Sequence, residues 1–458
     1  MEALSIGEIV SASKGRLMNP IQDLTVTEVS IDSRRIKPGD MFIALQGESF
    51  DGHDFISKAV ENGAALVVTH KPLNECGIPY ILVEDTLKAL QDIARYYRSR
   101  FRIPFVAITG SSGKTTSKDM IASVLSQRYR VLKTEGNMNN AIGLPLTLLK
   151  LQYNHEIAVL EMGMNSPGEI ELLSDIVRQD ISVISNVGTA HIEKLGSRKN
   201  ILKAKLEILA YFNSDSTAVI NGDNDMLASL HSEDYLIVRY GLEDGNDIRA
   251  YEIEEKGEEG IFFKVDLDGK QESFKVLLPG IHNVYNALSA IAIARLFSVE
   301  AEDIRKGLQS FKPSKMRMDI INTGNGIKII NDAYNANPES MRAAMNVLQS
   351  LSSGSRSVCI FADMLELGDT SEKEHYGIGE YAAASGVDVI VASGNFSGAV
   401  IRGAEASGMD SKNVYAFPTK EEAAFQLEKI LKPGDIVLVK GSRSMKMEYI
   451  VDFLRERG

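Results

Sequence analysis

Short apolar runs alternate with amphipathic helical patterns over most of the chain. The first series of these runs lies at residues 105–109, 156–163, 181–188 and 216–222. A second series follows at residues 327–332, 357–364, 388–393 and 435–442. Because consecutive parallel strands need crossover helices between them, this alternation predicts parallel sheets in an α/β fold. The runs of the second series end in polar or small residues, where open sheets of this kind bind ligands.

The first hundred residues have the pattern of a smaller α/β unit. Strands are predicted at 40–45 and 65–69, and helices at 55–63 and at about 87–102. Pro104 disfavours helical backbone at the residue before it, so residue 103 is the expected first linker.

Residues 248–278 differ, because apolar and polar positions alternate there. A period of two is typical of antiparallel strands with one exposed face, and Asp268 and Gly269 form a typical hairpin turn. An Ala-rich helix over about 284–296 closes this part. We predict an N-terminal α/β domain, a central parallel-sheet domain and a C-terminal Rossmann-like domain, at residues 1–102, 103–312 and 313–458.

Composition supports this division. A chain of 458 residues fits three domains, since a domain usually holds about 150 residues. Hydrophobic residues make up 44% and charged residues 24%, which excludes a disordered, collagen-like or coiled-coil chain. No run reaches the roughly 18 apolar residues of a membrane helix. Residues 1–10 carry Glu2 and Glu8 but no basic residue, so we expect no signal peptide.

Charge and cysteine content narrow the function further. A net charge of −12 argues against a nucleic-acid partner but allows an anionic ligand in a local pocket. The two cysteines, Cys76 and Cys359, are too few for a disulfide framework or a four-cysteine zinc site. We interpret them as reduced thiols of a cytoplasmic protein.

The segment GSSGKTT at residues 110–116 carries the clearest chemistry. It follows an apolar run and opens a helical pattern, as a phosphate-binding loop does. Glycines let backbone N–H groups face phosphate oxygens, Lys114 adds a positive charge, and the Thr115 hydroxyl suits Mg²⁺. The loop is shorter than the common pattern of this kind. The predicted ATP-binding residues here are Gly110, Ser111, Ser112, Gly113, Lys114, Thr115 and Thr116.

Four further polar residues stand near the ends of apolar runs or on the helix that follows. Glu161 could hold Mg²⁺ or could simply end a strand. His191 could be a metal ligand, although a lone histidine is more often structural. Lys203 and Lys205 lie on a helical pattern, where a solvated face is the ordinary interpretation.

The last polar candidates flank the third domain. In HNVYNA, at 282–287, Asn283 and Asn286 could contact adenine or cap the helix. Arg317 could bind a phosphate and Asp332 a ribose, although each alone is typical of a surface charge. Together with the phosphate loop, these residues favour ATP chemistry. A P-loop kinase, a nucleotide-driven switch and a binding protein without turnover stay open on the residues alone.

In its order along the chain, this set of features resembles the Mur ligases. These are the ATP-dependent amide-bond ligases of cytoplasmic peptidoglycan precursor synthesis. The resemblance rests on the short phosphate loop, Glu161, the His191 turn, the helix lysine and HNVYNA, and it extends from about Ser30 to Glu448. It implies that the three domains bind, in order, a UDP-linked precursor, ATP and the incoming amine.

Four stretches are similar to the branch of the family that adds D-alanyl-D-alanine to UDP-MurNAc-tripeptide. They are DSR (32–34) with MFIALQG (41–47) and FDGHDF (50–55), TEGNMNNAIGLP (134–145), NDAYNANPESM (331–341), and ADMLELG (362–368) with VKGSRSMKME (439–448). The nearest alternative is the branch that adds a single amino acid, but its DYAHTP-like and DNPR-like segments are not found. Folylpolyglutamate synthetase shares the middle-domain chemistry without the N-terminal segments.

The resemblance also implies roles. It assigns one Mg²⁺ to Thr115 and Glu161 and a second to His191. Lys205, rather than Lys203, matches the family lysine that CO₂ converts into a carbamate metal ligand. The implied catalytic residues are Lys114, Glu161, His191, Lys205 and Arg317.

The implied binding residues form two groups. Further ATP contacts come from Asn283, Asn286, Arg317 and Asp332. The substrate residues are Ser33 and Arg34 for uridine, Asn139 or Asn140 for the tripeptide end, and Asn335 and Asn337 for D-Ala-D-Ala.

The implied reaction proceeds through an acyl phosphate and gives UDP-MurNAc-pentapeptide, ADP and phosphate. Residues 313–319 would be a hinge whose closure brings Arg317 and Asp332 onto ATP and excludes water. We expect a cytoplasmic monomer of cell-wall synthesis that binds UDP-MurNAc-tripeptide and D-Ala-D-Ala, without nucleic acid or membrane insertion.

Overall fold

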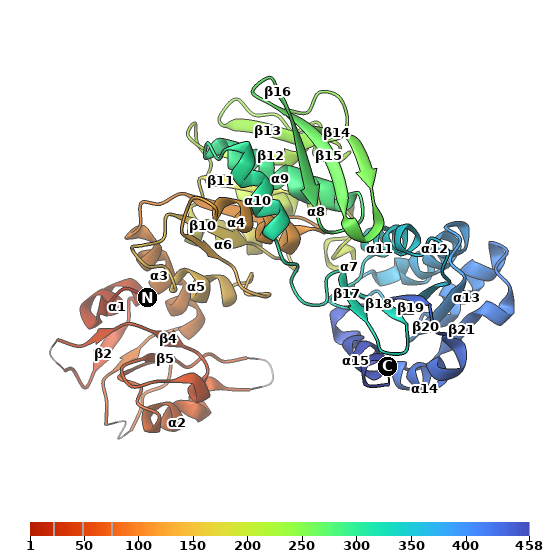
Figure 1. Cartoon of the computed structure of the whole chain (residues 1–458). Coiled ribbons are helices and arrows are strands. Elements are labelled where there is room, and N and C mark those ends of the chain that lie inside the picture. The colour runs from red at the N-terminus through yellow and green to blue at the C-terminus, as the bar shows by residue number, and fades with distance from the viewer. Residues whose placement is uncertain (22, 48–49, 75–76, 458) are drawn as a thin grey trace.

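The chain folds into three lobes, each built on its own main sheet (Figure 1). The structure is a computed structural model that describes residues 1–21, 23–47, 50–74 and 77–457. The predicted α/β class is confirmed, since each main sheet contains parallel strands and is flanked by helices. In these ranges no helix has the length and apolar character needed to cross a membrane.

The N-terminal lobe has a five-stranded sheet in the order β2-β7-β6-β5-β4. Its strands are β2 (Arg16–Met18), β4 (Val29–Ser30), β5 (Met41–Ile43), β6 (Leu66–Thr69) and β7 (Tyr80–Leu82). A separate pair joins β1 (Leu4–Ser5) to β3 (Thr25–Val26). The helices are α1 (Ile6–Ser13) and α2 (Ile56–Glu61), with 3₁₀ turns η1 (Ser33–Arg35) and η2 (Gly52–Phe55). The predicted strands and the short helix between them are therefore present, each shortened at its ends.

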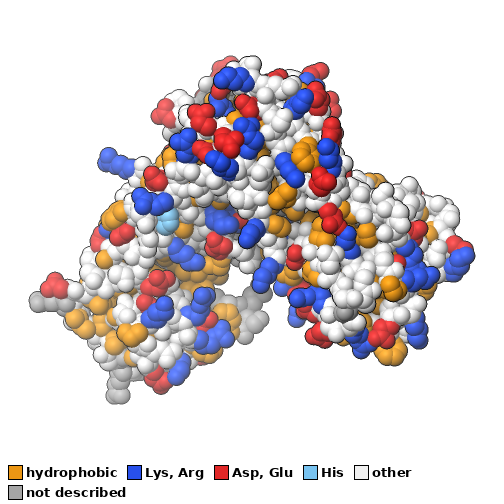
Figure 2. All heavy atoms as spheres, in the orientation of Figure 1, with side chains coloured by type: hydrophobic (Ala, Val, Ile, Leu, Met, Phe, Trp, Pro, Cys, Tyr) orange, Lys and Arg blue, Asp and Glu red, His pale blue; other side chains and the backbone are white. Residues whose placement is uncertain are grey.

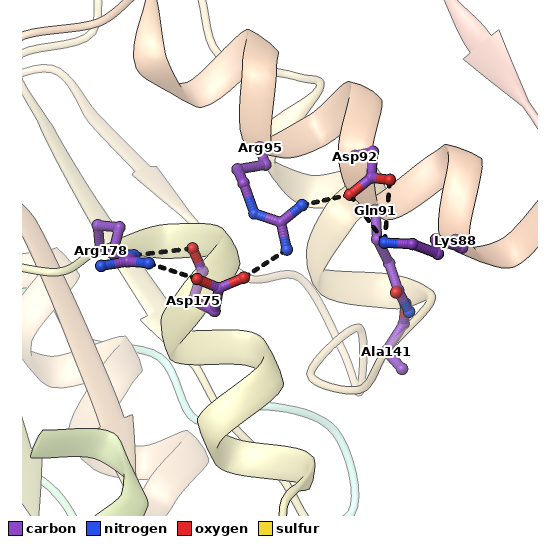
Figure 3. A network of polar contacts seen from close by, with 7 residues as sticks. All are labelled: Lys88, Gln91, Asp92, Arg95, Ala141, Asp175 and Arg178. Atoms are coloured by element: carbon purple, nitrogen blue, oxygen red, sulfur yellow. Dashed lines mark hydrogen bonds and ion pairs between the residues drawn. The ribbon is translucent and has the colours of Figure 1, made fainter. Parts of the chain in front are cut away.

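Helix α3 (Thr86–Ser99) joins this lobe to the middle one (Figure 3). The Gln91 side chain donates to the Ala141 carbonyl at 3.2 Å. Arg95 donates to the Asp175 carboxylate at 2.5 Å, and Arg178 bonds the same carboxylate at 2.5 Å. A helix that contacts both lobes in this way fixes their relative orientation.

The connection after α3 is packed. Phe101 is 4% exposed and belongs to one apolar cluster that spans both lobes, and Ile103 packs against that cluster. The expected linker at residue 103 therefore lies in a shared core and not in an exposed loop.

The middle lobe has a nine-stranded sheet in the order β16-β15-β14-β13-β12-β11-β8-β10-β9. Its strands are β8 (Phe105–Thr109), β9 (Val131–Lys133), β10 (Ile157–Glu161), β11 (Ile181–Ile184), β12 (Thr217–Asn221), β13 (Leu236–Gly241), β14 (Ile248–Glu255), β15 (Ile261–Leu267) and β16 (Lys270–Val276). Neighbours from β9 through β14 run parallel, and β14, β15 and β16 are antiparallel. Asp268 (φ 52°) and Gly269 (φ 74°) make the predicted hairpin turn.

Helices cover both faces of this sheet. One face carries α4 (Lys114–Leu125), α9 (His282–Leu296) and α10 (Ala301–Ser310), and the other carries α5 (Gly143–Leu148), α6 (Glu169–Val177), the short α7 (Ile192–Leu195) and α8 (Arg198–Leu206). Val106 and Ile108 of β8 pack toward the first group, and Ala107 between them packs toward the second. Burial on both faces explains why these strands are continuous apolar runs.

The C-terminal lobe has a six-stranded sheet in the order β17-β18-β22-β19-β20-β21. Its strands are β17 (Asp319–Asn322), β18 (Lys328–Asn331), β19 (Ser357–Ala362), β20 (Val389–Ser393), β21 (Val414–Phe417) and β22 (Ile436–Lys440). Only the edge strand β17 is antiparallel to its neighbour. The helices α11 (Pro338–Leu351), α12 (Ser371–Ala384) and α13 (Ser397–Ala406) cover one face, and α14 (Lys420–Ile430) and α15 (Glu448–Glu456) the other.

Of the two cysteines, Cys359 lies in β19 and is fully buried, which raises the pKa of its thiol. Cys76 lies outside the described residues.

Candidate active site

The order of strands in the middle sheet reverses at β8, and a pocket lies at this point. The chain leaves β8 toward β9 and β10 on one side and reaches β11 on the other. Ligands bind parallel sheets at such a switch point, beyond the carboxyl ends of the strands. A pocket of about 570 Å³ lies there, and residues of the middle and C-terminal lobes line it. Figure 2 shows the molecule hollowed between its lobes on the viewed face.

Most of the predicted site residues meet in this pocket. Those that line it are Ser111, Ser112, Gly113, Lys114, Thr115, Thr116, Asn139, Asn140, Glu161, His191, Asn283, Asn286, Arg317, Asp332, Asn335 and Asn337. Gly110 and Lys205 are not among the lining residues. Ser33 and Arg34 lie apart in the N-terminal lobe, where the exposed Arg34 pairs with Asp32 at 2.9 Å.

The phosphate loop is held by side chains as well as by its own backbone. Lys114 Nζ donates to the Gly110 carbonyl at 2.7 Å, and burial lowers the pKa of Lys114. The Asn186 carboxamide oxygen accepts from the backbone N–H groups of Ser111 (3.0 Å) and Ser112 (2.9 Å). Asn186 was not predicted to have a role, because nothing in its local sequence shows that it faces the loop.

Gly113 offers a direct test of this loop. Its φ of 77° is left-handed, and a Cβ there would lie 2.7 Å from the Asn286 Oδ1. We expect Gly113→Ala to lower ATP affinity at least about tenfold and to cost roughly 1–3 kcal/mol of stability, because both strain and the contact act. Calorimetric titration with ATP and thermal unfolding would measure the two effects.

Gly168→Ala is the matched control, since Gly168 has a φ of 84° but no atom of the described residues lies within 4 Å of an added Cβ. It should lose stability and keep ATP affinity. Wild-type ATP affinity in Gly113→Ala would contradict the importance of this close approach.

Glu161 ends β10 with a carboxylate that the protein satisfies only in part. The side chain is 2% exposed, and its Oε1 accepts from the Asn139 amide at 2.8 Å. Its Oε2 is buried and has no hydrogen-bond partner among the described residues. Buried polar atoms are rarely left unpaired, so a cation or a ligand donor fits this oxygen.

His191 lies between the middle and C-terminal lobes. Its φ is 65°, which is left-handed, and its Nδ1 lies 2.5 Å from the Glu366 Oε2. The contact with His191 keeps the pKa of the Glu366 carboxyl below its usual value. Glu366 belongs to the ADMLELG stretch, which the sequence singled out without giving this glutamate a function.

The two candidate lysines have opposite environments. Lys203 is exposed, whereas Lys205 is 1% exposed. Burial, and then the charge of Lys114, lower the pKa of Lys205 well below its usual value. Within the described residues, the Lys205 Nζ has neither a hydrogen bond nor an ion pair; by contrast, Lys118 Nζ, equally buried, donates to a carbonyl at 2.6 Å.

Asn283 and Asn286 line the pocket, but the protein already uses their amides. Asn283 donates to the Pro279 carbonyl at 2.8 Å, and Asn286 donates to Asn283 at 3.0 Å. The Asn286 oxygen accepts from the Ser117 hydroxyl at 3.0 Å. These bonds fix α9 against α4, so the two amides support the phosphate-loop helix whether or not they also contact adenine.

Two of the charged residues that the C-terminal lobe contributes to the pocket were predicted, Arg317 and Asp332. The Arg317 guanidinium lies 4.1 Å from the centre of the Tyr334 ring, and its buried Nε has no hydrogen-bond partner in the described part of the chain. Asp332 follows β18 and is paired with the buried Lys440, which also donates to the Asn335 carbonyl at 2.9 Å. Lys440 was not predicted as a site residue.

The predicted asparagines of the substrate ends differ in what they already bind. Asn337 caps α11, since its oxygen accepts from the Ser340 N–H at 2.8 Å. The Asn140 oxygen accepts from the Gly143 N–H at 2.9 Å. Asn335 is exposed at the pocket wall. Of these three, Asn335 has the side chain most accessible to a ligand.

His282 also lines the pocket, and burial lowers its pKa to about 4. The unfolded chain, with a histidine pKa of about 6.5, takes up a proton first as the pH falls. The stability that depends on a neutral His282 is therefore fully present above pH 6.5 and is lost as the pH falls toward 4. Between pH 6.5 and pH 4, the free energy of unfolding should fall by about 3 kcal/mol less in His282→Asn than in the wild type. Urea unfolding at each pH would measure it.

His231→Asn is the control, because His231 is exposed. It should follow the wild-type pH dependence. Equal acid sensitivity of His282→Asn and the wild type would contradict a lowered pKa of His282 in the folded protein.

A phosphate loop at the switch point of a parallel sheet, walled by a Rossmann-like lobe, defines a multidomain P-loop nucleotide-binding protein. Family models match three parts of the chain: "Mur ligase family, catalytic domain" at 25–98, "Mur ligase middle domain" at 108–294, and "Mur ligase, glutamate ligase domain" at 316–443. The chain belongs to the Mur ligase family, as the sequence predicted.

Relatives of known name cover the whole chain. The UDP-N-acetylmuramoyl-tripeptide–D-alanyl-D-alanine ligase of Bacillus subtilis is 40% identical over 99% of this chain and 98% of its own length. The enzyme of that name from Escherichia coli is 34% identical over 100% of both chains. A crystal structure of MurF from Acinetobacter baumannii superposes with a TM-score of 0.91 at 34% identity, over 100% of this chain and 99% of that one. MurF from Thermotoga maritima, in complex with ADP, has a TM-score of 0.81 at 28% identity, over 94% and 97%.

Proposed function

We propose that this chain is the ATP-dependent ligase that joins D-alanyl-D-alanine to UDP-N-acetylmuramoyl-tripeptide. Relatives of that name match it from end to end, and one MurF structure is a complex with ADP. The observation that carries the activity is the pocket where the phosphate loop meets Arg317 and Asp332 of the C-terminal lobe. The proposed domains are residues 1–102 for the UDP-linked substrate, 103–312 for ATP, and 313–458 for the dipeptide.

The residues around Glu161 fit Mg²⁺. Its buried Oε2 has no partner among the described residues, and the Thr115 hydroxyl lines the same pocket. Hard cations take oxygen ligands, and the Glu161 carboxylate and the Thr115 hydroxyl would supply them. No cluster of three His, Cys, Asp or Glu side chains that could hold a metal occurs in the described ranges. Mg²⁺ held there would neutralise charge on the transferring phosphoryl group. We assign His191 to a second ion.

Lys205 is the proposed site of carbamylation. A neutral amine is the form that attacks CO₂, and the lowered pKa of Lys205 favours that form. A nitrogen–carbon bond forms, and one proton leaves to solvent. The product is a carbamate anion, which the positive charge of Lys114 stabilises and which can serve as a metal ligand.

In the proposed reaction, the terminal carboxylate of the tripeptide attacks the γ-phosphorus, and the bond to ADP breaks. Lys114 and Arg317 hold the phosphate oxygens as charge moves. The amine of D-Ala-D-Ala, after it loses a proton, attacks the acyl carbon and displaces phosphate. The substrates of the proposed reaction are ATP and a UDP-linked precursor, so we place the reaction in the cytoplasm and in cell-wall synthesis.

Contacts of the segment between the middle and C-terminal lobes favour a hinge shorter than residues 313–319. The Ser314 hydroxyl donates to Asp119 of the middle lobe at 2.7 Å. The Met316 carbonyl accepts from the Tyr334 N–H of the C-terminal lobe at 3.2 Å. We therefore propose that the pivot lies between Ser314 and Met316, and that Arg317 moves with the C-terminal lobe.

Phosphate release tests the proposal. The assay contains ATP, Mg²⁺ and UDP-MurNAc-tripeptide, with D-Ala-D-Ala compared against single amino acids. Release that requires the dipeptide is the expected result. Release with a single amino acid on a UDP-MurNAc-dipeptide, and none with D-Ala-D-Ala, would keep the ligase chemistry and reject the substrate.

A further inference from the structure

The loop that carries His191 is fixed by carboxylates of the C-terminal lobe. The Glu366 Oε2 lies 2.5 Å from the His191 Nδ1, and the Glu366 carbonyl accepts from the Glu193 N–H at 3.2 Å. A second carboxylate of the C-terminal lobe, that of Glu339, accepts from the Thr189 N–H and hydroxyl, each at 3.0 Å. The His191 ring of the middle lobe thus lies against a carboxylate of the C-terminal lobe.

The backbone on both sides of this contact is strained. His191 and Glu366 each have a φ of 65°, in the left-handed region that residues other than glycine disfavour. An exposed ion pair adds little stability, and the Glu366 side chain is 46% exposed. The pair therefore does not stabilise the fold by more than its own conformation costs. Strain that persists in such a place is typical of functional positions.

We propose that Glu366 is a positioning residue for His191. Its carboxylate lies 2.5 Å from Nδ1 and is placed to take a hydrogen bond from a proton there. That bond would fix the ring orientation and leave the Nε2 lone pair free to bind a cation. Because Glu366 belongs to the C-terminal lobe, the histidine is set for metal binding only when that lobe is docked. This inference rests on the proposed function, in which His191 holds a metal ion.

The first readout is the tautomer of His191 in the protein without nucleotide. Nitrogen-15 NMR of histidine-labelled protein, well above the ordinary imidazole pKa of about 6.5, distinguishes Nδ1–H from Nε2–H. The chain has seven histidines, and loss of one signal in His191→Asn assigns the resonance. We expect Nδ1–H in the wild type, a shift toward Nε2–H in Glu366→Ala, and retention of Nδ1–H in Glu366→Gln, whose carbonyl still accepts.

The second readout is Mn²⁺ affinity in the presence of ADP, measured by electron paramagnetic resonance. Loss of a ligand's orienting partner typically weakens metal binding about 10–100-fold, and we expect this in Glu366→Ala with partial recovery in Glu366→Gln. Glu372→Ala is the matched control, since it removes an exposed ion pair with Arg402 in the same lobe. It should leave the tautomer and the Mn²⁺ affinity unchanged.

The role of Glu366 and the proposed function can fail independently of each other. An unchanged tautomer and wild-type Mn²⁺ affinity in Glu366→Ala would overturn the positioning role. Failure of the proposed function is seen separately, as wild-type protein that releases no phosphate with D-Ala-D-Ala. The tautomer comparison needs neither ATP nor substrate, so it tests Glu366 in either case.

Discussion

Lys114→Ala should lower the rate of ADP formation by at least about 10³-fold. Its ammonium is the positive charge of the phosphate loop, and it faces a pocket that also contains Glu161 and Arg317. Removal of one preorganised charge from a transition state of phosphoryl transfer has an effect of this size. Rapid-quench measurement of ADP with ATP, Mg²⁺ and both substrates would determine the rate.

The loss should be confined to nucleotide chemistry. Ser33 and Arg34, the residues proposed for uridine, lie outside the phosphate-loop pocket, so the variant should bind UDP-MurNAc-tripeptide as the wild type does. Lys194→Ala, on the exposed surface of α7, should react at the wild-type rate. Normal turnover of Lys114→Ala would reject the phosphate-loop assignment.

The interior strands were predictable because their environment determines their sequence. A strand buried on both faces is a continuous apolar run, and β8, β10 and β11 are buried along their whole length. In the middle and C-terminal lobes, the strands that were missed are short or lie partly exposed; they are β9, β13, β17 and β21. Their apolar pattern is therefore too weak to distinguish a strand from a loop.

The candidate site was predictable where one segment contains the whole signal. The phosphate loop is such a segment, since strand, glycines, lysine and helix are consecutive. Asn186, Glu366 and Lys440 gave no such signal, because each meets its partner only in three dimensions. Glu366 contacts His191 from another lobe, and no local pattern in either stretch predicts that approach.

The burial of Lys205 was also not predictable from its local sequence. A lysine on a helix is solvated by default, and only the resemblance to the Mur ligases distinguished it from Lys203. The structure buries one and exposes the other, which the weak amphipathic pattern of α8 did not indicate.

Lys205→Ala should be inactive, and millimolar short carboxylates such as acetate or formate should partly restore its activity. The proposed carbamate supplies an anionic oxygen ligand at a buried position, and the smaller side chain leaves room for a free carboxylate to take its place. Phosphate release with and without added carboxylate would measure this rescue. Lys203→Ala, two residues earlier on the exposed side of the same helix, should keep full activity and show no response to carboxylates. If Lys205→Ala is fully active without them, the lysine is not a metal ligand; if it is inactive and no carboxylate restores it, its role is that of an amine and the carbamate is rejected.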